Sequence, residues 1–212
     1  MNNKKSDNKK NQSIIDQAVL YIKNNKKPII TYAVLIIALV AIIVGVKTYQ
    51  TRKYQKLWGN FFLARYNVSQ SENGTDTSAL ETFVSQNANT AAGAQGALML
   101  GEMAWQAKDY NKAEGYYAQA AKVKEFEPLA TAALIVAKLA QNKYDEVIAL
   151  ADDFAAKHGT HFALTQVLQN KALALELSGK TEEAKQVYTQ IIQQEPTGYN
   201  AQFAESKLRT LK

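Results

Sequence analysis

The side chains best suited to chemistry in this sequence are its two histidines, His158 and His161, which lie three residues apart. Together with the carboxylate of Asp152 or Asp153, they could hold a divalent metal ion. The same histidines also fit an ordinary solvated loop between two helices. The spacing therefore leaves one candidate metal site to be weighed against the rest of the chain.

Other reactive constellations are absent from the sequence. It contains no cysteine, which excludes thiol and disulfide chemistry. It has no glycine-rich phosphate loop and no G-x-S-x-G motif. Gly93, Gly96 and Gly101 are spaced along a predicted helix, which favours close contact between helices. We therefore expect no catalytic residue, no cofactor and no bound metal, and we interpret the chain as a protein that is not an enzyme.

The element that organises the chain is an apolar run from Ile29 to Val46, eighteen residues without a charge. At a rise of about 1.5 Å per residue the run is about 27 Å long, close to the thickness of the hydrocarbon core of a bilayer. It ends at Val46-Lys47 without the small residues of a cleavage site. We interpret it as an uncleaved signal anchor that crosses a membrane once.

The charges around this run predict its orientation. Residues 1–28 hold seven lysines against Asp7 and Asp16, whereas residues 29–212 are nearly neutral, with 18 Lys and Arg against 17 Asp and Glu. The positive-inside rule then places the N-terminus in the cytoplasm and residues 47–212 on the other side. Because the basic surplus belongs to the tail, the main domain is predicted to have no nucleic-acid surface.

The tail has two predicted parts. Met1–Gln12 is rich in Asn and Lys and is expected to be disordered. From Ser13 onward, apolar residues at helical spacing fit a short amphipathic helix on the membrane surface, and a flexible tail remains the alternative.

Beyond the run, the sequence predicts helices only. Thr48–Gln70 has helical periodicity, Ser71–Thr77 is a loop, and Ser78–Gln86 is a shorter helix. Nothing alternates with period two over a useful length and Pro is scarce, so we expect the domain to be all-helical.

A repeated segment is the main signal of the domain. KDYNKA (Lys108–Ala113), NKYDEV (Asn142–Val147) and GKTEEA (Gly179–Ala184) each mark a point where one helix ends and the next begins. Ala113 and Val147 are 34 residues apart, which is the tetratricopeptide period, and Val147 and Ala184 are 37 apart.

The copies differ in how well they match the tetratricopeptide pattern. The first copy resembles it closely, and its matching positions are Leu100-Gly101, Ala113, Tyr117 and Ala120. The third copy matches at Ala172, Ala184, Tyr188 and Pro196. The second is degenerate: Ile135 replaces the glycine, and Ala151 and Phe154 exchange the aromatic and small positions.

These observations predict an all-α protein with a single N-terminal transmembrane helix followed by a tetratricopeptide-like helical-repeat solenoid. Residues 1–28 form the basic cytoplasmic tail, 29–46 the anchor and 47–212 the repeat domain. The repeats are predicted at about 94–127, 128–161 and 165–198, with a capping helix at 199–212.

Resemblance to tetratricopeptide arrays also implies a binding site, because the first helix of each repeat lines their concave face. The positions carried over give a protein-binding groove lined by Leu98, Trp105, Leu129, Val136, Leu139, Leu173 and Leu177. This set is too apolar for a groove that grips a charged peptide end. Either the groove binds an apolar or unfolded segment, or the chain's own Thr48–Gln70 or Tyr199–Lys212 fills it.

The order of segments and the run LALELSGKTEEAKQVYTQII (Leu173–Ile192) resemble the YfgM-like family of ancillary subunits of the bacterial SecYEG translocon. That resemblance implies a single-pass inner-membrane protein of a Gram-negative cell with a periplasmic repeat domain. It implies as partners the SecYEG translocon, the membrane-anchored prolyl isomerase PpiD and unfolded secreted proteins, which the family helps to pass to periplasmic chaperones. Two alternatives stay open: a general envelope scaffold in division or peptidoglycan assembly, and stress signalling through the cytoplasmic tail.

Overall fold

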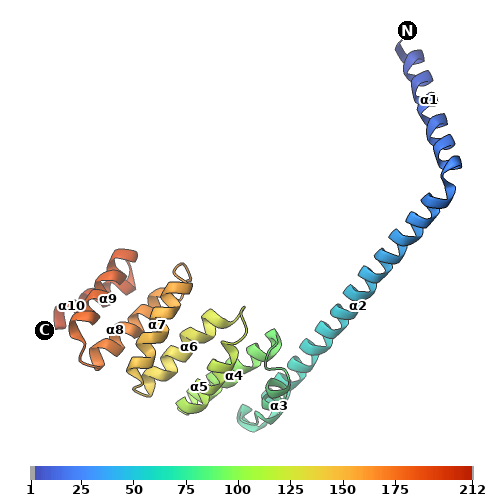
Figure 1. Cartoon of the computed structure of the whole chain (residues 1–212). Coiled ribbons are helices and arrows are strands. Elements are labelled where there is room, and N and C mark those ends of the chain that lie inside the picture. Colours follow the sequence, from blue (N-terminus) through green and yellow to red (C-terminus); the bar gives the residue numbers. More distant parts are fainter. Residues whose placement is uncertain (1–2, 212) are drawn as a thin grey trace. The chain divides into compact units, whose positions relative to one another are not determined.

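The computed structural model describes residues 3–211, and these residues contain helices and no strand (Figure 1). They divide into two compact units, with the boundary between Lys56 and Leu57. The predicted all-helical fold with one long apolar N-terminal helix is confirmed. The elements are α1 (Asn3–Asn24), α2 (Lys26–Gln70), a 3-10 turn η1 (Glu72–Gly74), α3 (Ser78–Gln86), α4 (Ala91–Gln106), α5 (Tyr110–Ala120), α6 (Glu127–Ala140), α7 (Tyr144–Lys157), α8 (Leu164–Leu177), α9 (Thr181–Gln194) and α10 (Tyr199–Thr210).

The first helix corrects the description of the tail. α1 begins at Asn3, ten residues before the predicted start at Ser13, so the expectation of disorder is wrong for Asn3–Gln12, while Met1 and Asn2 lie outside the described residues. No Gly or Pro interrupts this stretch, and half of its residues, four Lys and one Gln, have good helix propensity. The helix that begins with the apolar residues therefore extends backward through the polar ones.

The apolar run lies within α2, a single helix of 45 residues. Every side chain from Ile29 to Val46 is exposed, and the most apolar window of the helix has none of its residues buried. Pro28 stands in the first turn of α2, where its missing N–H costs no hydrogen bond. By length and composition α2 can cross a membrane, and it continues as one helix through the predicted Thr48–Gln70 segment.

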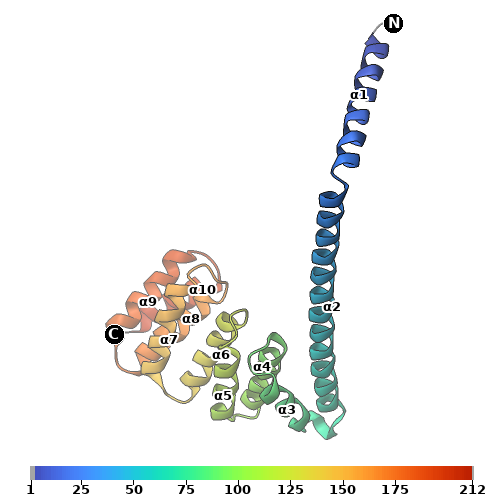
Figure 2. The same ribbon diagram turned by 45° about the vertical axis from the view of Figure 1, so that its right-hand side comes forward.

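The repeat unit is a pair of antiparallel helices, and three pairs follow in order: α4 with α5, α6 with α7, and α8 with α9 (Figure 2). The first helix of each pair ends in the same backbone motif. The residue after its cap has a left-handed φ, and the next N–H bonds to a carbonyl five residues earlier, as in a Schellman motif. The three left-handed residues are Lys108 (61°), Asn142 (58°) and Gly179 (78°), and the bonds are Asp109–Ala104 (2.9 Å), Lys143–Lys138 (3.0 Å) and Lys180–Leu175 (2.8 Å).

The two helices of a pair fit together through one small and one large side chain. In the first pair Gly101 lies against the ring of Tyr117, since a Cβ at Gly101 would come within 2.5 Å of that ring. In the middle pair the sizes are reversed, because Ile135 stands on α6 and Ala151 on α7, both fully buried. The degenerate copy thus fills the same space from the opposite helix.

Different helices cover the two ends of the repeats. At the first end, Phe61 near the end of α2 is buried against Phe83 of α3, with ring centroids 5.8 Å apart. At the other end, α10 packs on α9, with Phe203 against Tyr188 at 6.2 Å. The helix predicted at the C-terminal end is therefore present, and it ends at Thr210.

Candidate protein-binding groove

The seven residues predicted to line the groove all lie on the first helices of the three pairs, α4, α6 and α8, and none of them is fully buried. Leu129 and Leu177 are the most exposed, at 48% and 53%. The other five are half-buried: Leu98, Trp105, Val136, Leu139 and Leu173.

The structure brings two of these residues together. Trp105 of α4 and Val136 of α6 line a hollow of about 230 Å³ between the first and second repeats, with Glu102, Tyr117 and Ala133 as the other walls. These residues come from three helices of two repeats, which are held in register by the buried contacts beneath them. The hollow can receive one medium-sized apolar side chain from a partner.

Trp105 is held in place from below and from one side. It packs on a buried cluster formed by Ala104, Ala113, Tyr117, Leu134 and Ala137. Its ring also lies beside that of Tyr110, with centroids 4.9 Å apart. A fixed aromatic wall loses little conformational freedom when a partner binds, which favours affinity.

The remaining predicted residues divide into two kinds. Leu139 packs against the core of the later repeats and Leu98 against the cores of the first ones, so both also stabilise the fold. Leu129, Leu173 and Leu177 are not among the side chains that form or pack on the described cores. No described contact joins these three to the hollow at Trp105.

A carboxylate stands beside the hollow. Oε2 of Glu102 accepts a hydrogen bond from the Tyr117 hydroxyl at 3.5 Å, and its Oε1 accepts one from Gln106 at 2.9 Å. Burial, together with the charge of Glu102, raises the pKa of Tyr117 to about 12. The tyrosine therefore stays neutral at physiological pH, and the wall presents one negative charge next to apolar surface.

The chain's own helices do not bury the predicted groove residues completely. α10 reaches polar positions of α8 instead: Asn200 accepts a hydrogen bond from Gln169 at 3.0 Å, and Lys207 pairs with Glu176 at 3.0 Å. The end of α2 packs on α3 and α4, where Phe61 lies near Gly96. The hollow at Trp105 thus remains open in the described structure.

A second hollow was missed by the sequence reasoning. It measures about 460 Å³ and is lined by Trp58, Phe61, Phe62, Arg65, Gln95 and Met99. The aromatic cluster in Trp58–Phe62 was visible in the sequence. That it would lie beside Gln95 and Met99 of α4 depends on how α2 packs, which no local pattern shows.

A polar network between the first two repeats was also missed. Lys138 of α6 is buried, and its Nζ lies 2.6 Å from Glu114 Oε1 and 2.6 Å from Glu146 Oε2. Lys143 and Gln141 bond to the other oxygen of Glu114, each at 2.7 Å. Burial opposes ionisation of Glu114, but the hydrogen bonds from Lys138, Lys143 and Gln141 outweigh it and lower its pKa to about 2.

The candidate metal ligands have other partners. Asp152 pairs with Lys171 and Asp153 with Lys157, whereas His158 Nε2 lies 2.6 Å from Glu127. His161 accepts a hydrogen bond from the Ala163 N–H at 3.2 Å. Within the described residues, no three His, Asp or Glu side chains converge as metal ligands would.

Comparison with known proteins gives one family. The family described as "Tetratricopeptide repeat-like domain" matches residues 20–212. No curated protein matches the chain. Among solved structures, the tetratricopeptide domain of OM64 from Arabidopsis is similar, with 19% identity and a TM-score of 0.48 over 55% of this chain and 93% of that one.

Proposed function

The chain belongs to the tetratricopeptide repeat-like family, and we propose that it is a membrane-anchored protein without catalytic activity that binds other proteins through the concave side of its repeats. The observation that carries this proposal is the open hollow between Trp105 and Val136. Two repeats shape it, aromatic and aliphatic side chains line it, and a partner's apolar side chain fits it. Large aromatic side chains in such hollows commonly dominate the energy of protein–protein binding.

The membrane part of the proposal rests on α2. Its run Ile29–Val46 is uncharged, exposed throughout and long enough to span the hydrocarbon core. The excess of lysines before the run favours a cytoplasmic N-terminus and repeats on the opposite side. In this arrangement the anchor restricts the repeats to the neighbourhood of the membrane, which raises their effective concentration toward membrane-bound partners.

The finer proposal is an ancillary role at the Sec translocon of a bacterial inner membrane. It is supported by the order of basic tail, single span and degenerate repeats, and by the similarity of Leu173–Ile192 to the last repeat of the YfgM-like family. In this role the hollow receives an apolar segment of an emerging secreted protein, or of PpiD, and SecYEG is the neighbour in the membrane. A transient apolar contact suits a protein that passes its client on.

The test is photo-crosslinking in intact membranes from a probe at position 105, with a matched probe at the exposed Gln190 of α9. We expect adducts from position 105 with translocon subunits, PpiD or nascent secreted chains, and few of these from position 190. Adducts with other envelope proteins would leave the binding function standing and reject the translocon. Adducts only within the chain would reject the hollow as a binding site.

A further inference from the structure

In the segment of α2 that follows the apolar run, every charged residue is basic. From Gln17 to Ser71 the sequence contains no acidic residue, and Asp16 and Glu72 are the nearest on either side. Lys47, Arg52, Lys53 and Lys56 lie in this segment, and all four side chains are exposed. None of the ion pairs formed by the described side chains includes them. Four positive charges within ten residues of one helix repel one another. Binding of an anionic group would relieve this repulsion.

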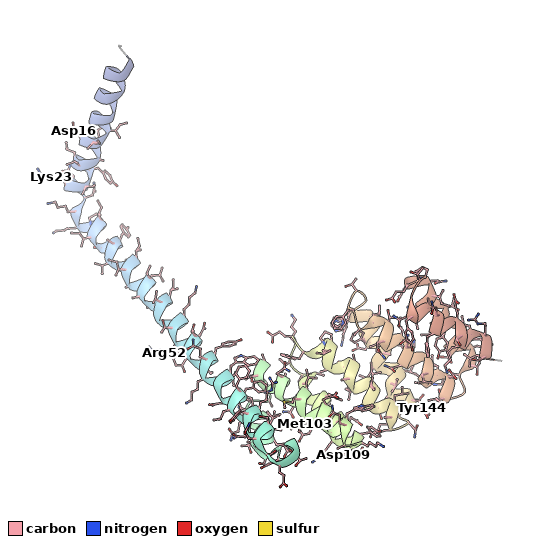
Figure 3. The ribbon with its side chains drawn as sticks, turned by 180° about the vertical axis from the view of Figure 1, so that it is seen from behind. Asp16, Lys23, Arg52, Met103, Asp109 and Tyr144 are labelled. Carbon is pink, nitrogen blue, oxygen red and sulfur yellow. The ribbon has the colours of Figure 1, made fainter. Side chains whose placement is uncertain are left out.

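The positions of these cations around the helix indicate what kind of partner they suit. Successive residues are turned by about 100° in an α-helix. Relative to Arg52, Lys56 is turned by about 40° and Lys53 by about 100°, so these three share one broad side, while Lys47, at about 220°, lies on the other. Figure 3 labels Arg52 on this stretch, where side chains project from α2 on several sides. A protein docked on the side of Arg52, Lys53 and Lys56 would leave Lys47 without an anionic partner, whereas lipid headgroups surround a helix and can reach all four.

The direction of the side chains points to the same partner. Cα–Cβ bonds in a helix tilt toward its N-terminus, so side chains after the apolar run lean back toward that run. Lys56 lies about 15 Å beyond Val46 along the axis, and the long stems of Lys and Arg reach back over several ångströms. Tyr49, which is 70% exposed, stands among them as the interfacial aromatic residues of membrane helices do.

We propose that Lys47, Arg52, Lys53 and Lys56 bind the headgroups of anionic phospholipids in the leaflet from which α2 emerges toward the repeats. The inference rests on the proposed membrane span and goes beyond it by naming the ligand. Four cations on this side of the span are disfavoured by the positive-inside tendency, and acidic headgroups offset that cost. The site would hold the helix at a fixed depth and enrich acidic lipid around it.

The experiment uses the full chain reconstituted in phosphatidylcholine bilayers. Electron paramagnetic resonance of spin-labelled phosphatidylglycerol or phosphatidylcholine measures the fraction of each lipid that the protein immobilises. We expect the wild type to prefer phosphatidylglycerol, and Arg52→Gln/Lys53→Gln/Lys56→Gln to lower that preference by about threefold, since each cation near an anionic surface contributes to attraction. The matched control, Lys122→Gln/Lys124→Gln/Arg209→Gln, removes three exposed charges of the repeat domain and should keep the preference.

Several results would overturn the proposal. A triple variant with the wild-type preference, or a control that loses as much, would show that these cations are not the site. Loss of the preference on replacing Lys23, Lys26 and Lys27 alone would place the site before the span. Displacement of the lipid by inorganic phosphate at constant ionic strength would identify free phosphate as the ligand. If neither lipid is immobilised, the chain does not insert, and the proposed span itself fails.

Discussion

Lys138 stands at a position that the neighbouring repeats fill with core residues. The equivalent residues, four before the left-handed residue of each turn, are Ala104 and Leu175, both buried. Lys138 is buried as well, and it remains charged there because Glu114 and Glu146 bond to it. A buried ion pair gains little over an apolar pair, but the loss of one partner leaves a charge unpaired. We therefore expect these ion pairs to favour the observed packing of the first two repeats over other packings that would leave a buried charge unpaired.

Replacement of Glu114 should show this in a pH-dependent way. Glu114→Gln is expected to lower the free energy of unfolding at pH 7 by about 2 kcal/mol, because the hydrogen bonds to charged partners are weakened. The pKa of Glu114 is about 2 in the folded chain against an ordinary value of 4.5. Its stabilisation is thus complete above about pH 4.5 and is lost as the pH falls toward 2.

The measurement is urea unfolding of residues 57–212 at a series of pH values for the wild type and the variant. The difference between them should shrink as the pH falls below about 4.5. Glu205→Gln, at an exposed position of α10, serves as the control and should change little at any pH. A difference that stays constant from pH 6 to pH 3 would contradict the role given to Glu114.

At the scale of elements, features set by short sequence motifs could be predicted from the sequence, whereas contacts between distant residues could not. The loop at Ser71–Thr77, the helix at Ser78–Gln86 and the repeated turns follow from short motifs, and the structure has them at those residues. The pairing of Lys138 with Glu114 depends on how two repeats pack. From the sequence alone, α6 was therefore predicted only as an apolar helix. For the same reason the sequence could not separate Val136, which lines the hollow, from Leu139, which packs on the core. Disorder over Asn3–Gln12 was inferred from composition, but the stretch has no Gly or Pro to end a helix, and α1 extends through it.

The turn motif makes a prediction that separates backbone conformation from packing. Gly179→Ala should lower the free energy of unfolding by about 1 kcal/mol, because a left-handed φ is strained for any residue with a Cβ. The site is open, with nothing near a new Cβ, so the loss comes from the backbone alone. Gly115→Ala is the matched control: it lies within α5 with equal space, and should raise stability by roughly 0.5–1 kcal/mol. If Gly179→Ala and Gly115→Ala changed the free energy of urea unfolding equally, the left-handed conformation at residue 179 would contribute nothing to stability.

The small and large residues that face each other within a pair are exchanged between the first and second repeats. This predicts that a second substitution can restore stability lost by a first. Gly101→Ile alone should be destabilising by about 1–3 kcal/mol, because its side chain would overlap the ring of Tyr117. Adding Tyr117→Ala reproduces the arrangement of Ile135 and Ala151 in the second repeat and should recover part of that loss. A double-mutant cycle on the unfolding free energies measures the coupling. Additive effects would mean that the two positions do not share one space.

At the scale of the whole molecule, the two ends of the chain are predicted to lie on opposite sides of a membrane. Since the chain has no native cysteine, single cysteines report without background. We expect a membrane-impermeant maleimide added outside intact inner-membrane vesicles of cytoplasmic-side-out orientation to label Ser6→Cys and to spare Gln190→Cys until detergent is added. The reverse pattern would invert the orientation, and labelling of both would reject the span.

In the repeat domain each helix packs mainly on its neighbours in the chain, from α3 and α4 through to α9 and α10. The main contacts of each helix in this domain are therefore with segments close to it in the sequence. In the proposed orientation this domain crosses the membrane as an extended chain, starting from its N-terminal end. Each pair can then close as soon as its second helix has emerged, so the protein is able to fold vectorially, in the order in which it is synthesised, and exposes little unfinished core on the way.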